Sequence, residues 1–346
     1  MGIFTPLSIG NLQLKNRLFR SATFEAGATS DGAPTKEHHR IYDEILKGDC
    51  GLIFTGIAYI SDEGKNSPKQ NGIHKSELIS EWKKITDRVH RQNGKIVVQL
   101  SHRGGSFVLP NENFNYKFLP EALNEEQIEK IIDDFEKSAY RSVAAGFDGV
   151  QIQANYGFLL GQFSCSLTNR RKDKWGGNLD GRFRLLFEII NRIRKTLPRS
   201  FPLMIKLDIS DKNVDVKEYS KIIRRMSQSG VDAFELTGNI NNILRKEKMS
   251  SVFDIECYFQ AEGELIKAKN KDLVIGIGGG VRSGSKIQEL MDIGFDFVAL
   301  SRPWIKEPDF GKKLFLDRKY KSKCQSCFNC LYYQRKGFNL GCYLNQ

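Results

Sequence analysis

The sequence predicts a (β/α)8 barrel, and three observations lead to this fold class. Eight short apolar runs rich in Val, Ile and Phe alternate with amphipathic helical patterns, as parallel βαβ units require. The length of 346 residues suits one such barrel with insertions. No linker divides the chain before about Asp317, and four of the seven cysteines follow that point. We therefore expect a barrel over residues 1–317 and a Cys-rich appendage over residues 318–346. An open doubly wound sheet remains an alternative on periodicity alone.

The predicted strands are short apolar segments bounded by glycine or polar residues. In chain order they are Leu18–Phe24, Gly51–Ile60, Lys95–Ser101, Gly149–Gln153, Leu203–Ile209, Ala233–Gly238, Val274–Gly279 and Phe297–Arg302. In a barrel, function belongs to the carboxyl ends of these strands and to the loops that follow them.

The predicted helices show apolar residues three and four positions apart. In Glu125–Gly146, Asn124 is the expected N-cap and Gly146 the expected end. The stripe expected to face the sheet is Ile128, Ile131, Ile132, Phe135, Ala139 and Val143. Similar patterns occupy Ser76–Gln92, Arg182–Thr196, Val216–Ser229 and Ser285–Ile293.

Composition narrows the class of protein. The formal net charge is +12, but the basic residues are mixed with acids along the chain, which is typical of a solvated surface rather than a nucleic-acid footprint. No apolar run approaches the roughly 20 residues that span a bilayer, and the first residues do not read as a secretory signal. The cysteines do not form a secreted disulfide framework. We expect a cytoplasmic protein that binds neither nucleic acid nor membrane.

A phosphate site is predicted between the last two loops of the barrel. The seventh strand ends in GIGGGVRSG (Gly276–Gly284) and the eighth in ALSRPW (Ala299–Trp304). Glycines let backbone N–H groups approach a phosphate, and Arg302 adds a charge-assisted partner. FMN, ribose phosphates and sugar phosphates all suit such a site. The alternative is a glycine-rich turn without a ligand.

Three longer motifs narrow the choice among these phosphate-containing ligands. They are Leu14–Glu25 (LKNRLFRSATFE), Val98–Gly105 (VQLSHRGG) and Ala145–Arg184, which begins AGFDGVQIQANYGF. With them, the sequence resembles the old yellow enzyme family of flavin oxidoreductases over nearly its whole length. The resemblance implies an FMN-binding barrel that takes hydride from NAD(P)H and passes it to an electrophilic small molecule.

The resemblance also implies roles for single residues. Lys206 would lie beside flavin N1 and O2, where a cation stabilises the anion of the reduced flavin. Gly56 would leave room for the ring, and Gln99 would hydrogen-bond its pyrimidine edge. The flavin would be lined by Ser21, Ala22 and Thr23, and its phosphate held by Gly279, Gly280, Ser301 and Arg302.

The chain departs from the family at the fourth strand. Many members carry His, then His or Asn, then Tyr, where this chain has Gln153, Tyr156 and Phe158. Gln153 and Tyr156 can still donate hydrogen bonds, and we expect them to contact the acceptor. Phe158 has no hydroxyl to deliver a proton, so we expect ordinary enone reduction to be poor. The alternative is that Gln153 and Tyr156 only pack the pocket.

The tail carries Cys324, Cys327, Cys330 and Cys342 at close spacing. Such a set suits a [4Fe–4S] cluster or a tetrahedral zinc ion, and an unmetallated remnant is the third possibility. It is similar to the cysteine set of 2,4-dienoyl-CoA reductase and trimethylamine dehydrogenase, where a [4Fe–4S] cluster passes electrons between FMN and other redox partners. The leading hypothesis is thus an NAD(P)H-dependent FMN oxidoreductase. The alternatives are an FMN/iron–sulfur electron-transfer protein with a redox protein partner and a degenerate FMN-binding barrel.

Overall fold

Eight parallel strands close into a barrel in this computed structural model, which describes residues 2–105, 116–155, 157–211, 213–238 and 255–344. The first strand of the ring pairs with both the second and the last, so the ring has no open edge. The strands are β3 (Leu18–Arg20), β4 (Leu52–Tyr59), β6 (Ile96–Ser101), β7 (Val150–Ala154), β8 (Leu203–Asp208), β9 (Ala233–Thr237), β10 (Val274–Gly278) and β11 (Val298–Leu300). The (β/α)8 prediction is confirmed, and the open sheet is excluded.

The first and last strands of the ring are shorter than predicted. The Ser21 amide still donates to the Leu300 carbonyl at 2.8 Å, but the chain then turns. The hydroxyls of Thr23 and Ser301 lie 2.7 Å apart beyond that turn. The two segments therefore leave the sheet side by side at the barrel mouth.

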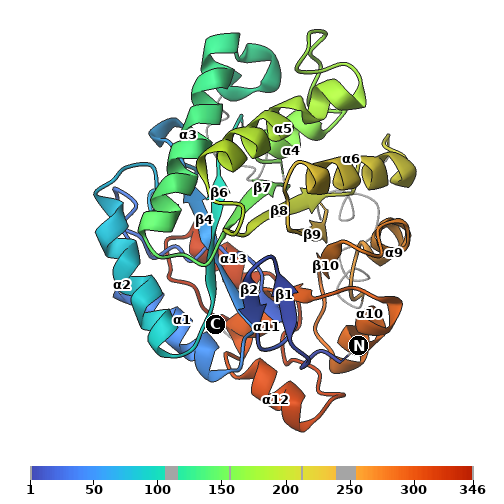
Figure 1. Cartoon of the computed structure of the whole chain (residues 1–346). Helices are drawn as coiled ribbons and strands as arrows, with labels where there is room; N and C mark the ends of the chain where they lie inside the picture. Colours follow the sequence, from blue (N-terminus) through green and yellow to red (C-terminus); the bar gives the residue numbers. More distant parts are fainter. Residues whose placement is uncertain (1, 106–115, 156, 212, 239–254, 345–346) are drawn as a thin grey trace.

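Helices surround the strands, as Figure 1 shows. They are α1 (Lys36–Lys47), α2 (Leu78–Arg91), α3 (Glu125–Ala144), α4 (Leu159–Ser164), α5 (Leu179–Thr196), α6 (Val216–Gln228), α9 (Gln260–Lys269), α10 (Gly284–Ile293), α11 (Arg302–Lys306), α12 (Phe310–Leu316) and α13 (Asn329–Arg335). Short additions are β5 (Asn71–Gly72), which pairs with β4, and the 3-10 helices Asp62–Gly64, Tyr116–Phe118 and Pro120–Ala122. Among the described residues, no helix is long and apolar enough to cross a membrane.

Helix α3 shows why these elements form where the sequence predicts them. Asn124 and Gln127 make a reciprocal capping box at its start, and Gly146 has φ +78° just beyond its end. The stripe from Ile128 to Ala139 is buried against the barrel. Val143, which we expected on the same face, is 39% exposed, so that part of the prediction is wrong. In the last turn the buried face passes instead through Ser142 and Ala145, both 0% exposed, and Val143 lies beside it.

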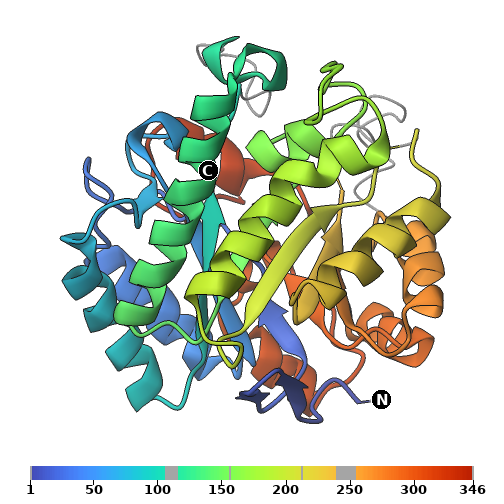
Figure 2. The ribbon, with the colours of Figure 1, turned by 45° about the horizontal axis from the view of Figure 1, so that its top comes forward.

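A hairpin that the sequence analysis did not predict covers the amino-terminal end of the barrel. Strands β1 (Leu7–Ile9) and β2 (Leu12–Leu14) pair antiparallel, and their apolar side chains pack with Phe19, Phe54 and other side chains inside the ring. In Figure 2 the hairpin lies at one end of the barrel and the red carboxyl-terminal segment at the other. The hairpin closes one end, so the carboxyl ends of the strands form the available mouth.

The tail lies over that mouth. Tyr320 and Ser322 both donate hydrogen bonds to the buried carboxylate of Glu307, the latter at 2.7 Å. Farther along, Gln334 Nε2 donates to the Phe24 carbonyl at 2.6 Å, next to the turn that follows β3. These contacts hold the tail against the loops that follow β3 and β11.

Candidate active site

A buried ion pair lies at the mouth of the barrel. Lys206 on β8 is 3% exposed, and its Nζ lies 2.8 Å from Glu235 Oε1 on the neighbouring strand β9. The same ammonium donates to Ser21 Oγ at 2.6 Å, and this hydroxyl donates to Glu235 Oε1 at 2.6 Å. A buried cation is costly without a partner, and Glu235 is the partner that the sequence analysis did not identify.

Two glutamines extend this network across the mouth. Gln151 Nε2 donates to Glu235 Oε2 at 3.0 Å, and Gln99 Nε2 donates to Gln151 Oε1 at 2.6 Å. Ser21, Gln99 and Lys206 were predicted to contact the flavin, and the structure brings them into one hydrogen-bonded chain. In this arrangement the amide of Gln99 is directed at Gln151.

Gly56, predicted to leave room for the flavin ring, lies against the buried carboxylate of Glu25. A Cβ on Gly56 would lie 2.2 Å from Glu25 Oε2, and the Gly56 amide lies 3.0 Å from each carboxylate oxygen of Glu25. Glu25 is buried and also pairs with Arg20, whose Nη2 lies 3.1 Å from Oε1. The missing side chain therefore leaves room for a buried carboxylate behind the turn that follows β3.

The predicted phosphate residues lie together on the loops after β10 and β11. Gly279 and Gly280 have φ values of +124° and +84°, which favour glycine. Arg302 begins α11, and its Nη2 donates to the Tyr258 hydroxyl at 3.1 Å. Arg302 Nη1 is buried without a hydrogen-bond partner in the described part of the chain. An unpaired guanidinium N–H beside a glycine turn fits the phosphate of FMN.

The end of β7 holds buried polar groups without partners. Gln153 Oε1 and both side-chain polar atoms of Asn155 are buried and have no hydrogen-bond partner among the described residues. Phe158, the residue that precedes α4, is 5% exposed. Tyr156 lies outside the described residues. Because unpaired buried amides are unfavourable, this end of the strand suits a ligand that completes their hydrogen bonds.

His102 follows β6 and was not singled out from the sequence, although it directly follows a predicted strand. Its Nδ1 accepts from the Gly104 amide at 3.1 Å, and its buried Nε2 has no partner among the described side chains. Burial lowers the pKa of His102 to about 3, so the imidazole is neutral at physiological pH.

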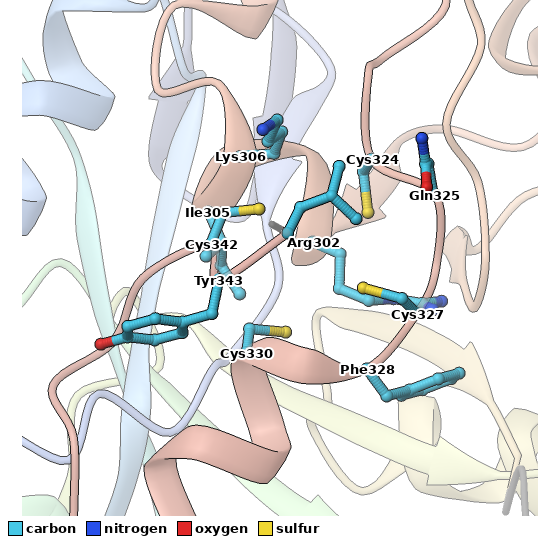
Figure 3. A pocket seen from close by; sticks show the side chains of 11 residues that line it. Arg302, Ile305, Lys306, Cys324, Gln325, Cys327, Phe328, Cys330, Cys342 and Tyr343 are labelled. Atoms are coloured by element: carbon cyan, nitrogen blue, oxygen red, sulfur yellow. The ribbon is translucent and has the colours of Figure 1, made fainter. Parts of the chain in front are cut away.

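The four tail cysteines line one cavity with Arg302 and Phe328. Figure 3 shows their sulfur atoms directed toward a common space. The Arg302 guanidinium stacks on the Phe328 ring, with 4.5 Å between the guanidinium carbon and the ring centroid. The predicted metal residues Cys324, Cys327, Cys330 and Cys342 are thus brought together.

The four thiols are not placed as the ligands of a single metal ion. In the described ranges, no group of three or more His, Cys, Asp or Glu side chains could hold a metal ion as placed. Burial raises the pKa of Cys330 to about 11 and that of Cys324 above its usual value, while Arg302 lowers both. All seven cysteines are free thiols.

Comparison with known sequences identifies the family. The profile of the NADH:flavin oxidoreductase / NADH oxidase family matches residues 2–320. NADPH dehydrogenase from Bacillus subtilis (strain 168) is 27% identical over 323 residues, which cover 90% of this chain and 93% of that protein. N,N-dimethylglycine/sarcosine dehydrogenase from Chromohalobacter salexigens is 24% identical, and the match covers 99% of this chain but 52% of that protein.

Solved structures show the same fold. 2-Naphthoyl-CoA reductase, in complex with 2-naphthoyl-CoA, superposes with a TM-score of 0.88 at 22% identity, covering 99% of this chain and 56% of that one. This chain therefore spans about half the length of that reductase. Morphinone reductase superposes with a TM-score of 0.77 at 23% identity, over 94% of this chain and 92% of that one. The family match over residues 2–320 shows that this chain is a member of the NADH:flavin oxidoreductase / NADH oxidase family and an FMN-dependent NAD(P)H oxidoreductase of the old yellow enzyme type.

Proposed function

We propose that this oxidoreductase reduces an electrophilic small molecule, one with an activated C=C bond or a similar group, bound at the end of β7. The observation that carries the proposal is the buried, unpaired amide oxygen of Gln153 together with both unpaired amide atoms of Asn155. Gln153 lies on β7 in register with Lys206 on β8, and Asn155 directly follows β7. An acceptor placed there can complete hydrogen bonds that the described residues leave open.

FMN, when bound, supplies the hydride chemistry by accepting hydride from NAD(P)H and passing it to the acceptor. Lys206 holds positive charge at the mouth and favours the anionic form of the reduced ring. Gln153 and Tyr156 orient the acceptor. Phe158 has no ionisable group, so Tyr156, another residue or water must supply the proton. We therefore propose poor turnover of simple enones, because a positioned acid contributes typically about 10²–10⁴-fold.

Stopped-flow measurement of the two half-reactions tests this function. Gln153→Leu should slow flavin reoxidation by the acceptor and leave flavin reduction by NADPH or NADH unchanged, and Tyr156→Phe should do the same if Tyr156 donates the proton. Gln288→Leu, on the outer side of α10, is the matched control and should change neither step. Phe158→Tyr should increase turnover of 2-cyclohexenone. Rapid cyclohexenone turnover by the unmodified protein, insensitive to Gln153→Leu and Tyr156→Phe, would refute this assignment.

The tail supports a second redox centre. Its four cysteines line one cavity and are separated by two, two and eleven residues. Four closely spaced thiolates suit a [4Fe–4S] cluster, which would exchange single electrons with a redox partner. Anaerobic purification with iron and sulfide should give both flavin and broad cluster absorbance, and a cluster-free protein with one bound zinc ion would contradict the proposal.

A further inference from the structure

A basic hollow lies beside the cysteine cavity. Arg282, Lys306, Lys321 and Lys323 line a space of about 550 Å³, together with Ser322, Cys324, Gln325 and Leu344. None of the residues predicted to hold FMN lines this space. Four of its residues also line the cysteine cavity: Lys306, Cys324, Gln325 and Leu344. The basic hollow and the thiols are therefore immediate neighbours.

The fold holds these cations in place. The Ser322 amide donates to the Arg282 carbonyl at 2.9 Å, and Lys321 forms a β-bridge with Ser283. Glu307 accepts hydrogen bonds from Ser322 Oγ at 2.7 Å and from the Lys323 amide at 2.6 Å. A single β-bridge and these hydrogen bonds thus attach the tail to the loop after β10, and cations from distant parts of the chain line one space.

The four basic side chains of the hollow form no ion pair with any described residue. Two carboxylates bind the same segments, but each already accepts hydrogen bonds from them. Glu256 Oε2 accepts from the amides of Arg282 and Ser283 at 2.7 and 2.9 Å, and Glu307 binds the tail.

The buried side chain of Arg282 indicates that the negative charge that would balance the hollow belongs to a small anion. Its side chain is buried, at 5% exposure, and its Nε has no hydrogen-bond partner among the described residues. A buried N–H without an acceptor is unfavourable, so an anion inside the hollow would satisfy it. A carboxylate on the convex surface of another protein has poor access to a group this deep, whereas a small anion can enter.

We propose that the basic hollow binds a phosphorylated small molecule through a phosphomonoester or diphosphate group. A phosphate group carries close to two negative charges and three acceptor oxygens, which suits several converging cations. The volume lies within the range of about 300–1,000 Å³ typical of small-molecule sites. One consequence of this anion site rests on the proposed cluster. An anion beside Cys324 disfavours the electron added to the cluster and lowers the cluster's reduction potential.

Isothermal titration calorimetry of the FMN-loaded protein with pyrophosphate tests the site. The native protein should bind pyrophosphate with an affinity that falls with salt, without losing flavin absorbance. Lys321→Glu/Lys323→Glu should weaken binding by about tenfold or more, because two attractive charges become repulsive. Lys217→Glu/Lys312→Glu makes the same charge change at exposed lysines outside the hollow and should bind as the native protein does. Arg282→Met, checked for bound flavin and native thermal stability, should also bind more weakly.

Three results would overturn the proposal. The first is no binding of pyrophosphate at millimolar concentration, and the second is equal loss in the two double variants. The third is protection of Lys321 from acetylation by an acidic electron-carrier protein but not by pyrophosphate, which would assign the surface to a protein. Failure to assemble a cluster with iron and sulfide would refute the second redox centre, whereas pyrophosphate binding by the same cluster-free protein would leave the anion site standing. In cluster-loaded protein, pyrophosphate should lower the cluster potential in a spectroelectrochemical titration.

Discussion

Lys206 is buried on β8, the fifth strand of the barrel, and forms an ion pair with Glu235 on the neighbouring strand β9. The family motif predicts the position of Lys206, but its pairing with Glu235 follows only from the register of β8 and β9. The ammonium also donates to Ser21 Oγ, and this hydroxyl donates to Glu235 Oε1, so Lys206 and Ser21, both predicted to contact the flavin, lie side by side.

Lys206→Met should lower the reduction potential of the bound flavin. It should also destabilise the protein by about 3–5 kcal/mol, because Glu235 remains as an uncompensated buried charge. Redox titration and urea denaturation measure the two effects. Lys206→Met/Glu235→Gln should recover part of the stability and shift the potential less than the single change, since both charges are gone. An unchanged or higher potential in Lys206→Met would show that Lys206 does not act on the flavin.

Arg302 connects two sites that looked separate in the sequence. Its unpaired Nη1 suits the FMN phosphate, while its guanidinium stacks on Phe328 beside the cysteines. Arg302→Ala should weaken FMN retention by roughly 1.5–3 kcal/mol, the range for a hydrogen bond to a charged group. Equilibrium dialysis measures this loss, and Arg318→Ala, an exposed arginine near the chain's end, is the control. Equal retention in the two variants would remove Arg302 from the phosphate site.

His102 makes stability depend on pH. Its folded-state pKa is lowered by burial from 6.5 to about 3, so between these values the unfolded chain binds a proton that the folded chain does not. The free energy of unfolding should therefore fall as pH decreases from 6.5 toward 3, and this loss should be smaller in His102→Gln. Chemical denaturation at several pH values checks the slope. Equal slopes for the two proteins would mean that His102 does not contribute.

At the scale of elements, periodicity identified the eight strands and five helices, because burial of one face of an element imposes a regular spacing on its apolar residues. It missed the hairpin β1–β2, whose strands have three residues each and offer too few alternations to be recognised. It placed Val143 on the buried face because the stripe was read from apolar residues, whereas the buried position in that turn is the small polar Ser142. Pairings such as Gly56 with Glu25 join segments 31 residues apart, and no local pattern encodes them.

Glu307 anchors the start of the tail to α11. Burial alone would raise the pKa of this carboxyl, but hydrogen bonds from Tyr320, Ser322 and Lys313 lower it to about 2, so it stays charged. Glu307→Gln should loosen the segment around Lys319–Lys323 and speed its cleavage by trypsin, while the barrel stays intact. Asp309→Asn removes the other, exposed carboxylate of Lys313 and is the matched control. Equal cleavage rates in the two variants would show that Glu307 is not the anchor.

At the scale of the whole molecule, the barrel and the tail are covalently continuous but chemically separable. The ring of strands closes without any tail residue, and the hairpin seals the opposite end. The tail adds thiols and cations over the loops that follow β3 and β11. The proposed hydride transfer at the mouth and the proposed cluster at the cysteines therefore rest largely on different parts of the chain.

A change confined to the tail should spare hydride transfer in the barrel. Cys330→Ser should prevent assembly of the cluster, because one of four ligands is gone, yet leave the strands and their network around Lys206 untouched. Flavin reduction by NADPH or NADH, and its reoxidation by a two-electron acceptor, should then proceed at native rates. Reduction of ferricyanide, a one-electron acceptor, should slow in proportion to cluster loss. Cys165→Ser makes the same chemical change outside the tail and should retain cluster, flavin and both activities. If Cys330→Ser instead abolishes hydride transfer while FMN remains bound, the two centres form one obligatory electron path, and the electron-transfer hypothesis replaces the acceptor reductase.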